Sequence, residues 1–235
     1  MKAIIGGTGV DSLEGLTLKK TVVGTPYGKV ALFVGDDLVF LPRHGSDHSV
    51  PPHLINYRAN VAALAALGVQ EAVGIYAVGS ISKALEPGDI GIVSDFIDVS
   101  GGAREHTFHI GGSSGVRHCA MDEVFDVALS NRMKALAPYL KDAGVYVCTN
   151  GPRLETKAEI RMFAHMGCDV VGMTLATEVG LLAEAGIRTL ALAYSINWAA
   201  GVEQANVSFI GDAQIEALKE QMTQLCCKAL LISSN

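Results

Sequence analysis

The sequence predicts a single α/β domain in which helices flank a mixed central sheet. Its 235 residues suit one large domain, and the apolar fraction of 49% is enough to build a sizeable core. Short apolar runs typical of strands alternate with segments of helical period along most of the chain. No repeat or linker interrupts this alternation, so we expect one domain over residues 1–235.

The expected strands are apolar runs, several of them without polar positions, as in a sheet covered on both faces. They are Ala3–Ile5, Val30–Val34, Leu38–Leu41, Ala72–Val78, Ile90–Ile97, Val145–Cys148, Val170–Gly172 and Thr189–Ile196. The expected helices are His53–Leu67, Asp122–Lys141, Thr156–His165, Ala176–Ala185 and Asp212–Leu231, with Asp122 and Asp212 as N-caps. The Gly- and His-rich stretch Asp98–Cys119 is expected to be a long functional or interfacial loop.

Charge and cysteine usage narrow the functional classes. The formal net charge of −6 disfavours nucleic acid as a partner, although a local arginine can still attract a small anion. The apolar start Met1–Ile5 is too short for a signal peptide or a membrane span, so no membrane association is expected. Five cysteines without a C-x-x-C pair indicate free thiols in a reducing cytoplasm.

Gly6-Gly7-Thr8-Gly9 follows the first expected strand directly. Glycines there let backbone N–H groups approach an anion, and the Thr8 hydroxyl adds a donor. A dinucleotide-binding fingerprint is the first alternative, but Ser12 stands where Gly or Ala is needed and no long helix follows. A plain tight turn is the second.

Two further segments carry residues suited to an anion. Arg43 and His44 follow a strand, and a guanidinium offers a planar fork that matches two phosphate oxygens. Such a pair on a loop is also a common solvated surface feature. Thr174 lies at the end of another apolar strand, where ligands collect in open α/β sheets.

Glu155 and Asn197 are candidates for reading a purine base. Glu155 stands near a helix start, where a carboxylate is also favoured by the helix dipole alone. Asn197 ends an apolar strand and is compatible with a simple turn. Its amide nevertheless carries donors and an acceptor, which suits a purine edge.

Several motifs occur together in a specific order. They are Ile4-Ile5-Gly6-Gly7-Thr8-Gly9, Thr25-Pro26-Tyr27-Gly28, Arg43-His44-Gly45, Asn56-Tyr57-Arg58-Ala59-Asn60, Glu86-Pro87-Gly88-Asp89, Gly151-Pro152-Arg153-Leu154-Glu155-Thr156 and Gly172-Met173-Thr174. Over nearly the whole chain this set resembles the purine nucleoside phosphorylase / methylthioadenosine phosphorylase family.

The resemblance implies a phosphorylase/hydrolase-like fold, a homotrimer, inorganic phosphate as co-substrate and no cofactor. It also implies roles for individual residues. Phosphate would be held by Thr8, Arg43, His44 and Thr174, with Ala77 beside the sugar and Met173 beneath it, while Leu154, Glu155, Asn197 and Ala199 would line the base site.

Further positions are candidates for the 5′ pocket or depart from the family pattern. His118 is compatible with reaching into a neighbouring subunit's 5′ pocket or with a solvated loop histidine. Val207 and Ile215 are guesses for the 5′ pocket. Tyr76 is a departure, since the family has a small polar residue there; its side chain either narrows the sugar site or points elsewhere.

Glu155 and Asn197, the two residues expected to contact the base, favour a 6-oxopurine. Ionised Glu155 can accept from N1–H, and the Asn197 amide can donate to O6 and accept from protonated N7. With adenine the carboxylate would face the N1 lone pair. The motif Asn197-x-Ala199-Ala200-Gly201 looks closest to bacterial S-methyl-5′-thioinosine phosphorylases. Methylthioinosine is therefore the expected substrate, with methylthioadenosine phosphorolysis and general inosine or guanosine phosphorolysis as alternatives.

The sequence gives less support to other kinds of site and function. His106 and His109 lack a third metal ligand, so no metal is expected. Ser195 and Cys148 have no histidine nearby in sequence to activate a nucleophile. Hydrolysis by water and a non-enzymatic nucleoside-binding sensor stay open, because phosphate-dependent purine release is what separates them from a phosphorylase.

Overall fold

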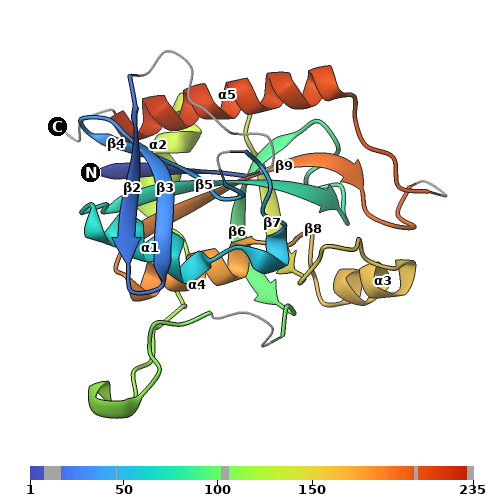
Figure 1. Ribbon diagram of the computed structural model, residues 1–235. Coiled ribbons are helices and arrows are strands. Elements are labelled where there is room, and N and C mark those ends of the chain that lie inside the picture. The colour runs from blue at the N-terminus through green and yellow to red at the C-terminus, as the bar shows by residue number, and fades with distance from the viewer. Residues whose placement is uncertain (8–16, 46, 102–105, 204–205, 232–235) are drawn as a thin grey trace.

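The protein is described by a computed structural model covering residues 1–7, 17–45, 47–101, 106–203 and 206–231. Within these ranges it forms an α/β fold around one large mixed sheet (Figure 1), as predicted. The strands are β1 (Lys2–Gly6), β2 (Lys19–Thr25), β3 (Gly28–Val34), β4 (Leu38–Pro42), β5 (Glu71–Ser80), β6 (Ile90–Asp98), β7 (Lys141–Cys148), β8 (Val170–Gly172) and β9 (Arg188–Trp198). Every expected strand is present.

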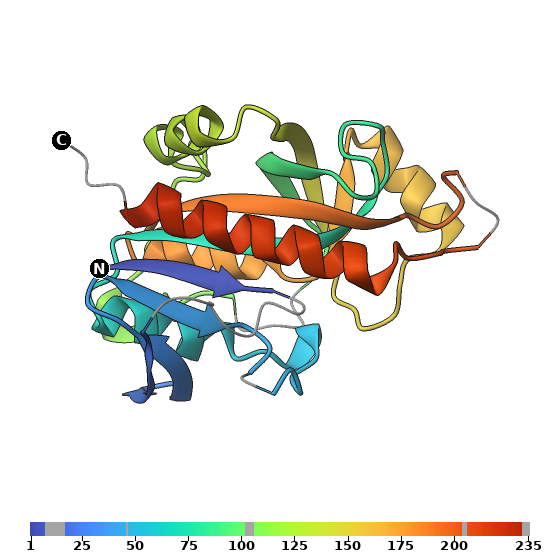
Figure 2. The same ribbon diagram turned by 90° about the horizontal axis from the view of Figure 1, so that it is seen from above.

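The topology of the sheet brings several strand ends to one place. The strand order is β2-β3-β4-β1-β5-β8-β7-β6-β9, and β9 also pairs with β5, so the last five strands close into a ring. Strands β4, β1, β5 and β9 run parallel, and their carboxyl ends therefore lie at the same edge (Figure 2). Strand β8 meets the end of β5 in antiparallel register, Gly79 opposite Val171.

Helices cover both faces of the sheet (Figure 1). They are α1 (Tyr57–Ala66), α2 (Val127–Leu136), α3 (Lys157–His165), α4 (Leu175–Glu184) and α5 (Asp212–Leu231). Met222 and Leu225 of α5 pack with strand residues and α2 in one buried cluster. Val61 and Leu64 of α1 pack with α4 and the opposite face of β1 and β4 in another. These two layers hold the strand ends rigidly in place.

The predicted helix Asp122–Lys141 is wrong at both ends. The helix α2 begins at Val127, and the carboxylate of Asp126, not Asp122, caps it by accepting from Leu129 N. It ends at Leu136 because Pro138 follows; proline lacks the N–H and clashes with the preceding turn. By Lys141 the chain has already entered β7.

The other helix starts differ by smaller amounts. The predicted helix from His53 is a 3₁₀ turn, Pro52–Leu54, followed by extended Ile55 and by α1, which Asn56 caps through Ala59 N. Helix α5 begins at Asp212, which is therefore its first helical residue and not the N-cap that was predicted. Helix α3 has a complete capping box between Thr156 and Glu159.

The long Gly- and His-rich loop joins β6 to α2. Its described part contains the 3₁₀ turn Gly112–Ser114 and stands away from the body of the molecule (Figure 1). Its base is anchored to α4, where Glu184 accepts from Thr107 Oγ1 and from Phe108 N, both at 2.6 Å. Beyond the anchor, Ile110 and Val116 are exposed. No helix in the described ranges is long and apolar enough to cross a membrane.

Candidate active site

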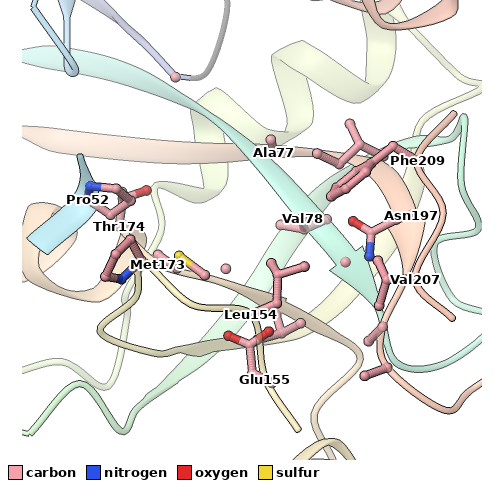
Figure 3. Close-up of a pocket in the computed structure, with 18 of the residues that line it drawn as sticks. Pro52, Ala77, Val78, Leu154, Glu155, Met173, Thr174, Asn197, Val207 and Phe209 are labelled. Carbon is pink, nitrogen blue, oxygen red and sulfur yellow. The ribbon is translucent and has the colours of Figure 1, made fainter. Parts of the chain in front are cut away.

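A cavity of about 220 Å³ opens where the carboxyl ends of β5 and β9 meet β8. Figure 3 shows Pro52, Met173 and Thr174 toward one side of it and Leu154, Glu155, Asn197 and Val207 toward the other. The full lining comprises Gly7, Arg43, His44, Pro52, Ala77, Val78, Gly79, Pro152, Leu154, Glu155, Val171, Gly172, Met173, Thr174, Ile196, Asn197, Ala199, Ala200, Val207 and Phe209. Polar groups thus lie at both ends of an otherwise apolar pocket, as in small-molecule sites.

The Arg43 guanidinium is buried beside the cavity, where an ion pair and a hydrogen bond to a backbone carbonyl hold it. Its Nε and Nη2 donate to Glu178 Oε1 at 2.7 Å and Oε2 at 2.6 Å, and its Nη1 donates to Ile75 O at 3.0 Å. Burial alone lowers the pKa of the guanidinium, but the attraction of Glu178 outweighs burial and raises that pKa. Arg43 therefore stays charged inside the fold.

Gly7 is required by this packing. A Cβ at Gly7 would lie 2.4 Å from Ile75 O and 2.9 Å from Arg43 Nη1. A side chain at this position would therefore push backbone or the guanidinium aside. The close approach explains why the chain has glycine after β1, whatever the loop binds.

His44 lies next to Arg43 and is neutral near pH 7. Its Nδ1 is 2.8 Å from Val50 O, so the ring donates from Nδ1, and its ring centroid is 4.9 Å from that of His48. Burial, followed by the positive charge of Arg43, lowers the pKa of His44 to about 4. Its other ring nitrogen is then an acceptor.

Thr174 stands at the start of α4, with its side chain buried and not used to cap the helix. Its backbone N donates to the buried Tyr146 hydroxyl at 3.4 Å. The carboxylate of Glu155 accepts from Thr149 Oγ1 at 2.7 Å. The Asn197 amide is buried and donates from Nδ2 to Trp198 O at 2.8 Å, which fixes its orientation.

A family profile described as the phosphorylase superfamily matches residues 2–231 of this chain. The chain belongs to the phosphorylase superfamily. It is 40% identical over 232 residues to a probable S-methyl-5′-thioinosine phosphorylase of Pseudomonas syringae, covering 94% of this chain and 93% of the relative. It is 42% identical over 215 residues to a probable 6-oxopurine nucleoside phosphorylase of Moorella thermoacetica, covering 88% and 82%.

Solved structures of the superfamily share the fold. A mutant adenosine/methylthioadenosine phosphorylase of Schistosoma mansoni, crystallised with methylthioadenosine, superposes with a TM-score of 0.86 at 30% identity. The match covers 97% of this chain and 89% of that one. The resemblance inferred from the ordered motifs is therefore confirmed.

In this phosphorylase-superfamily chain most of the predicted site residues meet at one cavity. Arg43, His44, Ala77, Leu154, Glu155, Met173, Thr174, Asn197 and Ala199 all line it, and so does Val207, which was only a guess. Their assignment to phosphate, sugar or base stays a prediction. Glu155 is not the capping carboxylate of α3, because Glu159 fills that position and the pKa of Glu159 falls to about 2 beside Arg153. The Glu155 carboxylate therefore has no capping role and lines the cavity.

Two predicted residues are not among those that line the cavity, and a third lies outside the described residues. Thr8 lies outside the described residues, as does Ser12 of the alternative dinucleotide fingerprint. His118 is exposed on the long loop. Ile215 packs from α5 against the core of the sheet and is not among the residues that line the cavity, so nothing in the described residues supports its assignment to the 5′ pocket.

Tyr76 points away from the cavity, the second of the two possibilities that the sequence left open. Neighbouring residues on a strand face opposite sides, so Ala77 lines the cavity and Tyr76 turns beneath Arg43. The Cζ atom of Arg43 lies 4.4 Å from the centroid of its ring. The hydroxyl donates to Glu178 Oε2 at 2.8 Å. The cavity is therefore not narrowed by Tyr76.

Sequence reasoning missed Phe209 and Pro52 as lining residues. Phe209 reaches the cavity because its backbone forms an isolated bridge with Asn197, a pairing without a sequence signal. Ser195 is buried with its hydroxyl 2.5 Å from that of Ser80, an arrangement without a base to activate it. The described residues contain no group of three or more side chains suited to a metal ion.

Proposed function

We propose that this chain cleaves 6-oxopurine nucleosides with inorganic phosphate and prefers S-methyl-5′-thioinosine, giving hypoxanthine and 5-methylthioribose 1-phosphate. The observation that carries the proposal is that Glu155 and Asn197 line one cavity with Arg43 and Thr174. Such a cavity offers groups for a base and for an anion at once. The names of the Pseudomonas syringae and Moorella thermoacetica relatives support the same reaction class.

The hydrogen bonds around Glu155 and Asn197 support a 6-oxopurine. Thr149 occupies Oε1 of Glu155 and leaves Oε2 to accept from N1–H of the base. Trp198 O takes one N–H of Asn197, leaving the other for O6 and the amide oxygen for N7–H. Adenine would set its N1 lone pair against the carboxylate, and an unpaired buried group costs about 1–3 kcal/mol. The site therefore favours hypoxanthine over adenine.

In the proposed reaction the C1′–N9 bond breaks and its electron pair moves to the purine. Asn197 stabilises the negative charge that develops over N7 and O6, a preorganised electrostatic effect. A phosphate oxygen held near Arg43 and Thr174 faces the cationic sugar and forms the new bond to C1′, while the acceptor nitrogen of the neutral His44 ring can take a hydrogen bond from a phosphate hydroxyl. The purine takes up, by way of solvent, the proton that hydrogen phosphate gives up on forming this bond, and no covalent enzyme intermediate or cofactor is needed. Holding both reactants in line supplies much of the rate.

Apolar side chains in the cavity lining support a 5′-methylthio substituent. Val207 lines the cavity, as does the half-exposed Phe209. A methylthio group buried against such side chains gains about 0.8 kcal/mol per buried carbon, which a 5′-hydroxyl does not. General inosine or guanosine phosphorolysis is the second candidate, because the Moorella thermoacetica relative is named for 6-oxopurine nucleosides as a class.

A homotrimer in the cytoplasm is part of the proposal. Ile110 and Val116 expose 80% and 84% of their surface on the projecting loop that also carries His118. Large apolar side chains so exposed favour contact with another subunit. The five cysteines are free thiols, which suits a reducing compartment. Light scattering on the purified protein tests the trimer; a monomer at micromolar concentration would contradict it.

The test of the function is purine release from methylthioinosine, methylthioadenosine, inosine and guanosine, each with and without phosphate. We expect phosphate-dependent cleavage with methylthioinosine far above methylthioadenosine. Dominant cleavage of methylthioadenosine would overturn the account of the base site and leave the reaction class standing. Release that ignores phosphate would indicate a hydrolase. Nucleoside binding without any release would indicate a sensor.

A further inference from the structure

We propose that Tyr76 is a positioning residue that holds Arg43 and Glu178 in the arrangement that binds the phosphate co-substrate. The inference rests on the proposed phosphorolysis and extends it to a residue that does not line the cavity. Tyr76, Arg43 and Glu178 form a buried unit in which every side chain is nearly inaccessible to solvent. The unit joins the end of β4 and the middle of β5 to the first turn of α4.

The guanidinium has a limited number of donors for an anion. An arginine carries five N–H groups, and in the described part of the chain one on Nε, one on Nη1 and one on Nη2 are committed to Glu178 and Ile75 O. One N–H on each Nη remains. Those two are the donors left for an anion at the cavity that Arg43 lines, provided that the plane of the guanidinium is held.

Glu178 is both the support of Arg43 and its competitor for phosphate. Its carboxylate balances the charge of Arg43 at 2.6 Å, in a buried place where the pair is screened little. An incoming phosphate must share the cation with this carboxylate. A group that donates a hydrogen bond to the Glu178 carboxylate, from the side opposite the phosphate, weakens this competition.

Tyr76 supplies that group. Its hydroxyl donates to Glu178 Oε2, the same oxygen that accepts from Arg43 Nη2. The bond takes up part of the accepting capacity of the carboxylate and fixes its rotation. The Tyr76 ring also lies under the guanidinium and supports its plane. Both effects help to keep the two remaining N–H groups free to donate to an anion.

The Tyr76→Phe variant separates the two effects, because it keeps the ring and removes the hydroxyl. We expect KM for phosphate to rise about tenfold, the value of one hydrogen bond to a buried charged group. KM for methylthioinosine should change less than about twofold, since the base end of the cavity is untouched. The dissociation constant of phosphate alone, measured by calorimetry, should rise in step with its KM.

Tyr194→Phe is the matched control. Tyr194 is also fully buried in the sheet, but its ring packs in the cluster under α5 and does not line the cavity. Its loss of a hydroxyl should leave both KM values at the wild-type level. This variant reports what the removal of a buried tyrosine hydroxyl does by itself.

The outcomes distinguish the proposed phosphorolysis from the positioning role of Tyr76. Phosphate-independent turnover of the wild-type enzyme overturns the proposed function itself. Phosphate-dependent wild-type turnover with an unchanged phosphate KM in Tyr76→Phe overturns only the positioning role. A lower kcat, similar increases in both KM values and a lowered Tm would together assign Tyr76 a merely structural role and also overturn the inference.

Discussion

The Asn197 amide is the group on which the leaving-group chemistry depends. It is 6% exposed, and its bond to Trp198 O at 2.8 Å holds it in one orientation before substrate arrives. Removal of one preorganised donor to a developing negative charge lowers kcat by about 10²–10³-fold, equivalent to about 3–4 kcal/mol. Asn197→Ala should therefore lower kcat/KM for methylthioinosine by about 10²–10³-fold, without a change in KM for phosphate.

The assay is steady-state hypoxanthine release at saturating phosphate, with circular dichroism to establish that the variant is folded. Asn131→Ala is the control, because Asn131 is exposed on α2 and does not line the cavity. It should retain wild-type kinetics. A folded Asn197→Ala enzyme with near-normal turnover would refute the argument that this amide stabilises the departing purine.

Three further predictions follow from single contacts. Thr149→Val removes the donor to Glu155 and should lower kcat/KM for methylthioinosine about tenfold while sparing methylthioadenosine; equal losses on both nucleosides would contradict a role in base reading. Gly7→Ala places a Cβ 2.4 Å from Ile75 O and should lower the free energy of unfolding by about 1–3 kcal/mol in urea titrations; an unchanged stability would show that the loop can move. The pKa of His44 is lowered to about 4 in the fold, so its stabilising effect is complete above its ordinary value near 6.5 and is lost as pH falls through that window. The wild-type enzyme should thus lose more stability between pH 7 and pH 4.5 than His44→Gln, and identical pH slopes would refute the assignment.

The strands were predictable because their apolar runs are also their physical cause. A strand buried on both faces has no polar positions, and each expected run became a strand. Helix ends were less predictable, because periodicity continues past the residues that stop a helix. Pro138 and the competing cap Asp126 were both readable in the sequence, and weighing them would have shortened α2 at each end.

The candidate site was partly predictable. The family resemblance led to nine of the twenty residues that line the cavity, and Val207, proposed without a motif, is a tenth. The ion pair between Arg43 and Glu178 was not predictable, because 135 positions separate these residues and only the fold joins them. The direction of Tyr76 did have a signal. If Ala77 faces the substrate, the alternation of a strand requires its neighbour to face the other way.

The most direct test of the central claim is the stoichiometry of phosphate consumption. Purified enzyme is incubated with methylthioinosine and limiting inorganic phosphate, and the hypoxanthine formed and the phosphate remaining are measured in the same samples. The account predicts one phosphate consumed for each hypoxanthine released, with release stopping when phosphate is exhausted. Hypoxanthine release that continues while phosphate stays constant would contradict it.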